Sequence, residues 1–222
     1  MKDLVSIDGT KQSIDLFTHD KQFLSKDYKV IAGMDEVGRG PLAGPVVVAC
    51  VVLPLEDDKI IQGINDSKKL PQKKREELYD KIVSTALQCI VYTADNNEID
   101  KLNILNATKR CMLNCINDLQ NCDLVLVDAV KFVDTKVPTY SIIKGDAKSY
   151  SIAAASIVAK VVRDRFMQQQ AKIYPEYFFD DNKGYGTAKH INALKQLGPC
   201  QIHRKSFIKN FFSPKQESFF DE

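Results

Sequence analysis

The chain has 222 residues, 31 of them Lys or Arg and 29 Asp or Glu, and 44% of its residues are apolar. This size and composition suit one α/β domain with a substantial core and exclude a fibrous, disordered or disulfide-dense protein. The six cysteines include no Cys-x-x-Cys pair, so we expect reduced thiols without a zinc site. No signal-peptide pattern and no membrane-spanning apolar stretch is found, so we expect a cytoplasmic protein with no membrane partner.

The charge is unevenly distributed along the chain. Residues 144–215 contain 13 Lys and Arg but only 5 Asp and Glu, whereas the rest of the chain is acidic. A basic segment of this kind favours a polyanionic partner such as a nucleic acid, although solvated helices often carry a similar bias.

The hydrophobic pattern predicts both strands and helices. Short apolar or alternating runs predict strands, and apolar residues that recur every three or four positions predict helices. In chain order, the predicted elements are a helix at 13–24, strands at 29–34 and 45–53, a helix at 71–86, a strand at 88–94, a helix at 98–119, strands at 123–128 and 139–144, and helices at 150–174 and 188–197. This order indicates a mixed sheet with helices packed on it.

Acidic residues follow several predicted strands at the point where the apolar run ends. Asp35 and Glu36 follow the first strand, Asp128 ends the fourth, and Asp146 comes shortly after the fifth. A sheet presents such residues to a crevice, where four converging acids would repel one another unless a cation intervened. Bound Mg²⁺ or Mn²⁺ would satisfy this arrangement, and paired ions commonly hydrolyse phosphodiesters. The alternative for any one of these residues is a simple turn acid.

One condition applies to the first pair of acids. Neighbouring residues on a regular strand point to opposite faces of the sheet, so Asp35 and Glu36 share a site only if the chain leaves the pleat there. The nearby Gly38 and Gly40 make such a departure feasible, because glycine adopts conformations that are closed to other residues.

Six sequence blocks resemble ribonuclease HII, the type 2 ribonuclease H, and occur in that family's order. The blocks are MDEVGRGPLAGPVVVAC at 34–50, NDSKKL at 65–70, LVDA at 126–129, IKGDAKSYSIAAASIVAKVVRDR at 143–165, NKGYGTAKH at 182–190 and HRKSF at 203–207. The resemblance implies an α/β, ribonuclease H-like fold with a mixed five-stranded sheet flanked by helices and a small helical C-terminal extension. Only 34 residues precede Asp35, which favours type 2 over the type 3 enzymes with their additional N-terminal domain.

The resemblance also implies a division of the chain and an activity. The expected parts are an N-terminal extension at 1–28, a catalytic domain at 29–174, a helical substrate-binding region at 175–215 and a tail at 216–222. The implied activity is metal-dependent cleavage of the phosphodiester 5′ of ribonucleotides, in RNA–DNA hybrids and within duplex DNA, leaving a 3′-hydroxyl and a 5′-phosphate. We expect a monomer.

The family's catalytic residues match the acids at the predicted strand ends. By resemblance, Asp35, Glu36, Asp128 and Asp146 hold two divalent ions, either Mn²⁺ or Mg²⁺. A catalytic histidine is not expected, because His190 and His203 lie in blocks that look structural in the family and a metal-activated water needs no such base.

Further residues are implied to contact the substrate. The Gly38-Arg39-Gly40 loop would read the ribose, since glycines let the main chain approach a 2′-hydroxyl closely. Tyr185 would pack against the sugar at the ribonucleotide junction, and its alternative is a loop aromatic that fills a groove. Arg39 could instead clamp a phosphate or pair with Glu36.

Lysines and arginines near the predicted site have weaker assignments. Lys68, Lys69 and Lys148 would hold phosphates, with solvated lysine as the alternative. We expect Lys160, Arg163 and Arg165 to follow a nucleic-acid strand or to pair with Asp164, rather than to enter the chemistry. Ser149 or Ser151 would cap the helix that follows Asp146.

Two features depart from the resemblance. The residue after Asp128 is Ala129, where the family usually has glycine. At the other end of the chain, Gln216, Ser218 and Phe220 match a short peptide pattern with which bacterial replication proteins bind the sliding clamp. A terminus with two unrelated phenylalanines is the alternative.

Two competing functions stay open at this level. A non-catalytic nucleic-acid-binding module with the same fold would be favoured by the loss of a carboxylate, and all four are present. A metallohydrolase acting on small molecules would leave the ribose-reading loop and the basic C-terminal third without a purpose.

Overall fold

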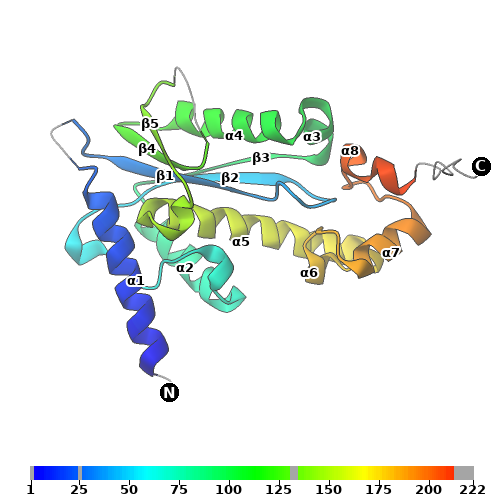
Figure 1. Ribbon diagram of the computed structural model, residues 1–222, viewed down its shortest axis with the longest axis horizontal. Coiled ribbons are helices and arrows are strands. Elements are labelled where there is room, and N and C mark those ends of the chain that lie inside the picture. The colour runs from blue at the N-terminus through cyan, green and yellow to red at the C-terminus, as the bar shows by residue number, and fades with distance from the viewer. Residues whose placement is uncertain (1–2, 25–26, 131–134, 213–222) are drawn as a thin grey trace, which may run out of the picture.

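The computed structural model describes residues 3–24, 27–130 and 135–212. These residues form a five-stranded sheet in the order β3-β2-β1-β4-β5 (Figure 1). The strands are β1 (Ile31–Val37), β2 (Val46–Val52), β3 (Gln88–Ala94), β4 (Leu124–Asp128) and β5 (Thr139–Ile142). Strand β1 pairs antiparallel with β2 and parallel with β4, so the expected mixed five-stranded sheet is confirmed.

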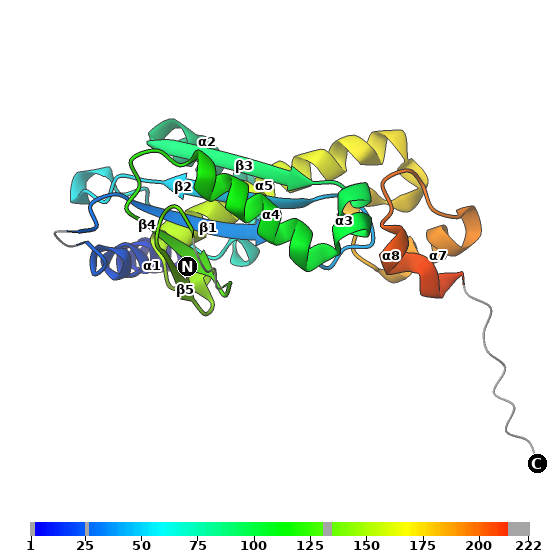
Figure 2. The same cartoon turned by 90° about the horizontal axis from the view of Figure 1, so that it is seen from above.

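Helices cover both faces of this sheet. The α-helices are α1 (Asp3–Lys21), α2 (Gln72–Thr85), α3 (Asn96–Leu102), α4 (Ile104–Asp118), α5 (Tyr150–Ile173), α6 (Phe179–Asn182), α7 (Ala188–Leu197) and α8 (Lys205–Ile208). Short 3-10 helices are η1 (Asp57–Lys59), η2 (Ser67–Lys69), η3 (Gly145–Ala147), η4 (Pro175–Tyr177) and η5 (Lys209–Phe211). Helices α5, α2 and α1 lie on one face, and α3 and α4 lie on the other (Figures 1 and 2).

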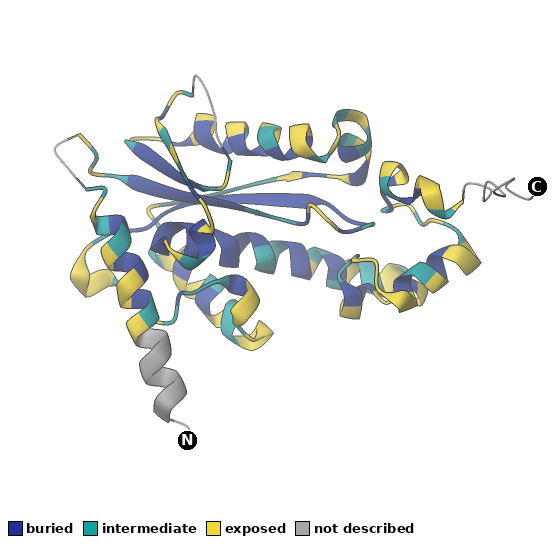
Figure 3. Cartoon of the chain, viewed as in Figure 1, coloured by how far each residue is buried: buried dark blue, intermediate teal, exposed yellow. Residues whose placement is uncertain are grey.

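The alternation of side chains along β2 divides the core into two layers. Val47, Ala49 and Val51 pack with the small residues of α5, whereas Val48 and Cys50 pack with the apolar side of α4. Both faces of β2 are therefore buried, which explains its continuous apolar sequence. Figure 3 shows the buried residues of α5 and α4 turned toward the sheet and the exposed ones turned outward.

The single helix predicted at 98–119 is wrong, because two helices occupy this segment. Asn103 interrupts them with a φ of 64°, and its side chain accepts a hydrogen bond from the Asn106 N–H at the start of α4. This positive φ takes the chain out of the helical conformation, and asparagine is a good N-cap, so one residue ends α3 and begins α4. The apolar periodicity continues across the break and hides it from the sequence pattern.

The N-terminus of α5 is held firmly against the end of the sheet. A Cβ atom at Gly33 would lie 2.0 Å from the Ser151 carbonyl carbon, so only glycine lets α5 lie this close to β1. Ser149 caps α5 by accepting a hydrogen bond from the Ile152 N–H. From α1, the Asp20 carboxylate accepts hydrogen bonds from the Ser149 hydroxyl and the Ser151 N–H, at 3.0 and 2.7 Å.

The C-terminal helices pack on the far end of α5. Met167 of α5 lies in one apolar cluster with Ala43, Tyr177, Phe179 and Ala193. This cluster joins the segment between β1 and β2 to the C-terminal region. Within the described ranges, no helix is both long and apolar enough to cross a membrane.

Candidate active site

Asp35 and Glu36 lie inside β1, two residues and one residue before its last residue, Val37. Asp35 pairs with Ala49 and Glu36 with Val48, in a regular register that continues to Val37. The chain therefore keeps the regular strand pleat at Asp35 and Glu36. The departure from the pleat that a shared site was expected to require is absent at these two residues. The alternation of a regular strand would turn Asp35 and Glu36 to opposite faces of the sheet. The Glu36 carboxylate nevertheless lies near enough to Asp35, Asp128 and Lys68 to interact with their charges.

Asp128 lies at the end of β4, next to Asp35 in the sheet. Met34 is the partner of Val127 in the parallel β1–β4 ladder, so Asp35 and Asp128 occupy the next positions on adjacent strands. One carboxylate oxygen of Asp128 accepts a hydrogen bond from the Gly145 N–H at 2.7 Å. This bond ties the end of β4 to η3, which carries the buried Asp146.

The electrostatics of these acids are coupled. Burial raises the pKa of Asp35 well above its usual value, and the neighbouring charges of Glu36 and Asp128 raise it further. The pKa of Glu36 is raised by burial, against the opposing effect of Arg39. The pKa of Asp128 is also raised by burial, with an added contribution from Asp146. The charges of the four acids therefore act on one another at this end of the sheet.

The environment of these carboxylates suits a cation. Oxygen Oε2 of Glu36 is buried and has no hydrogen-bond partner among the described residues. Lys68 supplies one counter-charge, with its Nζ 3.2 Å from an Asp146 oxygen, but its side chain is 77% exposed. In the described ranges, no group of three or more Asp, Glu, His or Cys side chains has the arrangement of a complete metal site. The acids supply the hard oxygen ligands that Mg²⁺ and Mn²⁺ prefer.

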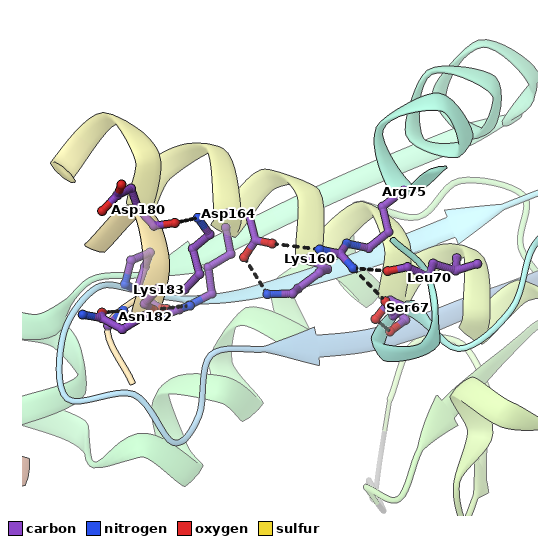
Figure 4. Close-up of polar contacts among 12 residues, drawn as sticks. Ser67, Leu70, Arg75, Lys160, Asp164, Asp180, Asn182 and Lys183 are labelled. Atoms are coloured by element: carbon purple, nitrogen blue, oxygen red, sulfur yellow. Dashed lines mark hydrogen bonds and ion pairs between the residues drawn. The ribbon is translucent and has the colours of Figure 1, made fainter. Parts of the chain in front are cut away.

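A polar network holds the turn that carries Lys68. Figure 4 shows Arg75 of α2 reaching the carbonyl oxygens of Ser67 and Leu70 and the carboxylate of Asp164 on α5. Oxygen Oγ of Ser67 also lies 2.9 Å from that of Ser156, which hydrogen-bonds Asp35. Ser67, Arg75 and Ser156 were not predicted as site residues, because single serines and arginines carry no distinctive signal in the sequence.

The expected ribose loop and Tyr185 lie together. A Cβ atom at Gly40 would be 3.9 Å from Cε1 of Tyr185, and the tyrosine is 43% exposed. Arg39 is exposed, and its guanidinium lies 3.4 Å from Glu36, as one of the sequence alternatives allowed. Lys148 follows η3 and is exposed, without a polar side-chain contact to the described residues.

The basic residues of α5 have different surroundings, and the expected pairing with Asp164 is found for Lys160. Lys160 pairs with Asp164 at 2.6 Å, and Arg165 pairs with Glu76 on α2. Arg163 is fully buried, so the expectation that it follows a nucleic-acid strand or pairs with Asp164 is wrong. Its partners are backbone carbonyl groups, which distant parts of the chain supply.

His190 and His203 form a buried pair away from the acids. Their Nε2 atoms lie 3.0 Å apart, and Nδ1 of His190 lies 2.9 Å from the Tyr185 carbonyl oxygen. Nδ1 of His203 accepts a hydrogen bond from the Cys200 N–H. This arrangement requires one proton on each ring, because His190 donates to Tyr185 and His203 donates to His190. Both histidines thus support the Tyr185 loop.

This pair should make the protein less stable in mild acid. Burial lowers the pKa of His203 from 6.5 to about 4, and repulsion between the two rings when both are protonated contributes. Between these two pH values the unfolded chain binds more protons than the folded one, so stability falls as the pH falls, by up to about 3 kcal/mol for this group. Urea unfolding should show that the free energy of unfolding falls less for His203→Gln than for the wild type when the pH is lowered from 7 to 5. The control variant Asp15→Asn, at an exposed position of α1, should lose as much stability as the wild type between pH 7 and pH 5. If His203→Gln also lost as much, the pH effect would not come from His203.

The fold and the acids define a class of protein. A mixed sheet in this order, with carboxylates on its adjacent parallel strands β1 and β4, is the architecture of a ribonuclease H-type nuclease. A family model described as Ribonuclease HII matches residues 32–210. The chain belongs to the ribonuclease HII family and is an endonuclease that hydrolyses RNA in RNA–DNA hybrids.

Individual relatives agree with this assignment. A ribonuclease HII from Caldicellulosiruptor saccharolyticus is 50% identical over 195 residues, which cover 87% of this chain and 94% of the relative. The structure of a PCNA:RNase HII complex from Archaeoglobus fulgidus matches with a TM-score of 0.71 and 26% identity, over 85% of this chain and 100% of that chain. A Bst-RNase HIII crystal structure in complex with Mn²⁺ has a TM-score of 0.60 at 19% identity, covers 75% of this chain and 61% of that chain, and shares the fold.

Proposed function

We propose that this chain is a divalent-metal-dependent endonuclease that cuts the phosphodiester 5′ of ribonucleotides, both in RNA–DNA hybrids and at ribonucleotides embedded in duplex DNA. The products would carry a 3′-hydroxyl and a 5′-phosphate. The observation that carries this proposal is the adjacency of Asp35 and Asp128 on parallel strands, with Asp146 tied to them through Gly145.

Asp35, Glu36, Asp128 and Asp146 would hold two ions, Mg²⁺ or Mn²⁺. When bound, the ions would supply Lewis-acid activation of a water molecule and charge stabilisation at the leaving oxygen. The raised pKa of Asp35, caused first by burial, and the unpartnered oxygen of Glu36 support this role, since a bound cation would stabilise the ionised carboxylate and would give that oxygen a partner. Lys68 would contribute a positive charge beside Asp146, where it could also contact a phosphate; Lys148 would contact a phosphate from its exposed position after η3.

The remaining residues would select the ribonucleotide. The main chain at Gly38, Arg39 and Gly40 would contact the 2′-hydroxyl, and the exposed ring of Tyr185 would pack on the sugar. A non-catalytic binding module is the alternative, but it would give no reason for keeping all four carboxylates.

Two wider expectations complete the proposal. A solved relative of this chain was captured with PCNA, which supports a contact between this protein and a sliding clamp. The residues of this chain that are expected to make this contact, Gln216, Ser218 and Phe220, lie outside the described residues. We further propose that the protein works as a monomer in the cytoplasm.

A cleavage assay tests the proposed function. The substrate is a DNA duplex with one ribonucleotide, incubated with the protein in Mg²⁺, in Mn²⁺ or in EDTA. We expect one cut on the 5′ side of the ribonucleotide with either metal and none in EDTA. Binding without cleavage in both metals would favour the non-catalytic alternative instead.

A further inference from the structure

Two arginines are buried beneath the segment that links β1 to β2. Arg163 comes from the middle of α5, and Arg204 directly precedes α8; both side chains are fully buried. Neither forms an ion pair with an Asp or Glu among the described residues. Burying a guanidinium is costly unless its N–H groups are satisfied, so their hydrogen bonds indicate what these residues are for.

Arg204 is bonded to the start and the end of the linking segment. It donates from Nη2 to the Gly38 carbonyl at 2.6 Å, from Nη1 to the Arg39 carbonyl at 3.0 Å and from Nε to the Gly44 carbonyl at 2.9 Å. One rigid, planar group thereby fixes the positions of three peptide units.

Arg163 completes the frame from the other side. It donates from Nε to the Pro45 carbonyl at 2.9 Å, from Nη2 to the Ala43 carbonyl at 3.1 Å and from Nη1 to the Lys183 carbonyl at 2.9 Å. Its guanidinium carbon also lies 5.8 Å from the centre of the Tyr185 ring. A Cβ atom at Gly38 would be 2.3 Å from its Nε, so the loop lies directly on this arginine.

These bonds determine which loop groups face outward. In a trans peptide the N–H points opposite to the C=O, and the described residues contain no cis peptide. Because the carbonyls of Gly38 and Arg39 point inward to Arg204, the N–H groups of Arg39 and Gly40 point away from it. Both residues are exposed, and neither N–H has a partner among the described residues. Two successive free amides of this kind can bind one oxygen atom or anion.

We propose that Arg204 and Arg163 are positioning residues for ribonucleotide recognition, which present the amides of Arg39 and Gly40 to the sugar-phosphate and hold Tyr185 beside them. This inference rests on the proposed function. It also gives the C-terminal HRKSF segment a role, since the shape of the loop depends on a side chain from position 204. The two buried positive charges lie directly behind the surface that would meet the nucleic acid.

The test compares Arg204→Lys with Arg165→Lys. The first variant keeps the charge but loses the planar fork, and the second changes an α5 arginine that is paired with Glu76 at the surface. Hydrogen–deuterium exchange of residues 37–45 reports on the loop in the free protein. Binding to duplexes with and without one ribonucleotide, in EDTA, and kcat/KM for the ribonucleotide duplex report on recognition.

We expect Arg204→Lys to exchange faster across the loop, to lose its preference for the ribonucleotide duplex, and to lose about 100-fold in kcat/KM, as a shift of about 1 Å in substrate position can cause. Binding to all-DNA duplex should stay at the wild-type level, and Arg165→Lys should resemble the wild type throughout. If Arg204→Lys fails to fold, Arg163→Lys is measured in the same way.

The outcomes separate this inference from the proposed function. A wild type that cuts, together with folded arginine variants that keep slow loop exchange and full ribonucleotide preference, would overturn the positioning role alone. A wild type that does not cut in either metal would overturn the proposed function, whereas a faster-exchanging loop in Arg204→Lys would still show that the arginine sets its shape.

Discussion

Asp128→Asn should abolish cleavage while the protein stays folded. The amide keeps the shape of the side chain and can still accept the hydrogen bond from the Gly145 N–H. It lacks the negative charge that a divalent ion requires. We expect a fall in kcat of about 1,000-fold, the upper end of what the loss of one preorganised electrostatic group causes. Single-turnover cleavage of a duplex with one ribonucleotide measures this change.

The matched control for this variant is Asp58→Asn. Asp58 is exposed in η1, far from the acids in the sheet, so its loss of charge should leave cleavage unchanged. A circular dichroism melting curve should be similar for both variants and the wild type. An Asp128→Asn enzyme with near-normal kcat would remove this residue from the proposed site.

Asp35→Asn should have two opposite effects, with cleavage lost and the metal-free protein stabilised. Burial and Glu36 raise the pKa of Asp35 well above 3.8. Above its usual pKa the folded protein therefore holds this proton more tightly than the unfolded chain. Stability falls as the pH rises through the window between the two pKa values, and the cost persists at higher pH. The neutral amide removes that cost.

Unfolding by urea in EDTA measures the second effect. At pH 8 we expect a higher free energy of unfolding for Asp35→Asn than for the wild type, and a smaller difference at pH 4. Added Mn²⁺ should stabilise the wild type more than the variant, since binding to the folded state shifts the unfolding equilibrium. Asp15→Asn, on the exposed side of α1, should show neither change. Equal stability of Asp35→Asn and the wild type at pH 8 in EDTA would refute the proposed cost of ionising the buried Asp35.

The sheet and most helices could be predicted from local patterns in the sequence. The strand predicted at 88–94 and the helix predicted at 188–197 coincide with β3 and α7, because alternation and periodicity directly reflect burial on one face. The break at Asn103 could not be predicted in this way, since a single left-handed residue leaves the periodicity on either side intact.

The position of the four acids after apolar runs predicts that they belong to one site, but it does not predict where they lie within their strands. Strand β1 extends through Val37, so Asp35 and Glu36 lie within a regular strand and not after its end. The role of Arg163 was misjudged for a different reason. Its acceptors, the carbonyls of Ala43, Pro45 and Lys183, come from distant positions and leave no mark in the local sequence. Charge composition alone suggested an exposed basic edge.

A crystal of the full chain grown or soaked in Mn²⁺, with anomalous diffraction recorded at the manganese edge, tests the central claim most directly. The account predicts two manganese peaks enclosed by the carboxylates of Asp35, Glu36, Asp128 and Asp146, with Oε2 of Glu36 now bonded to an ion. A map without a peak at this position, from crystals in which the four side chains are well ordered, would contradict it.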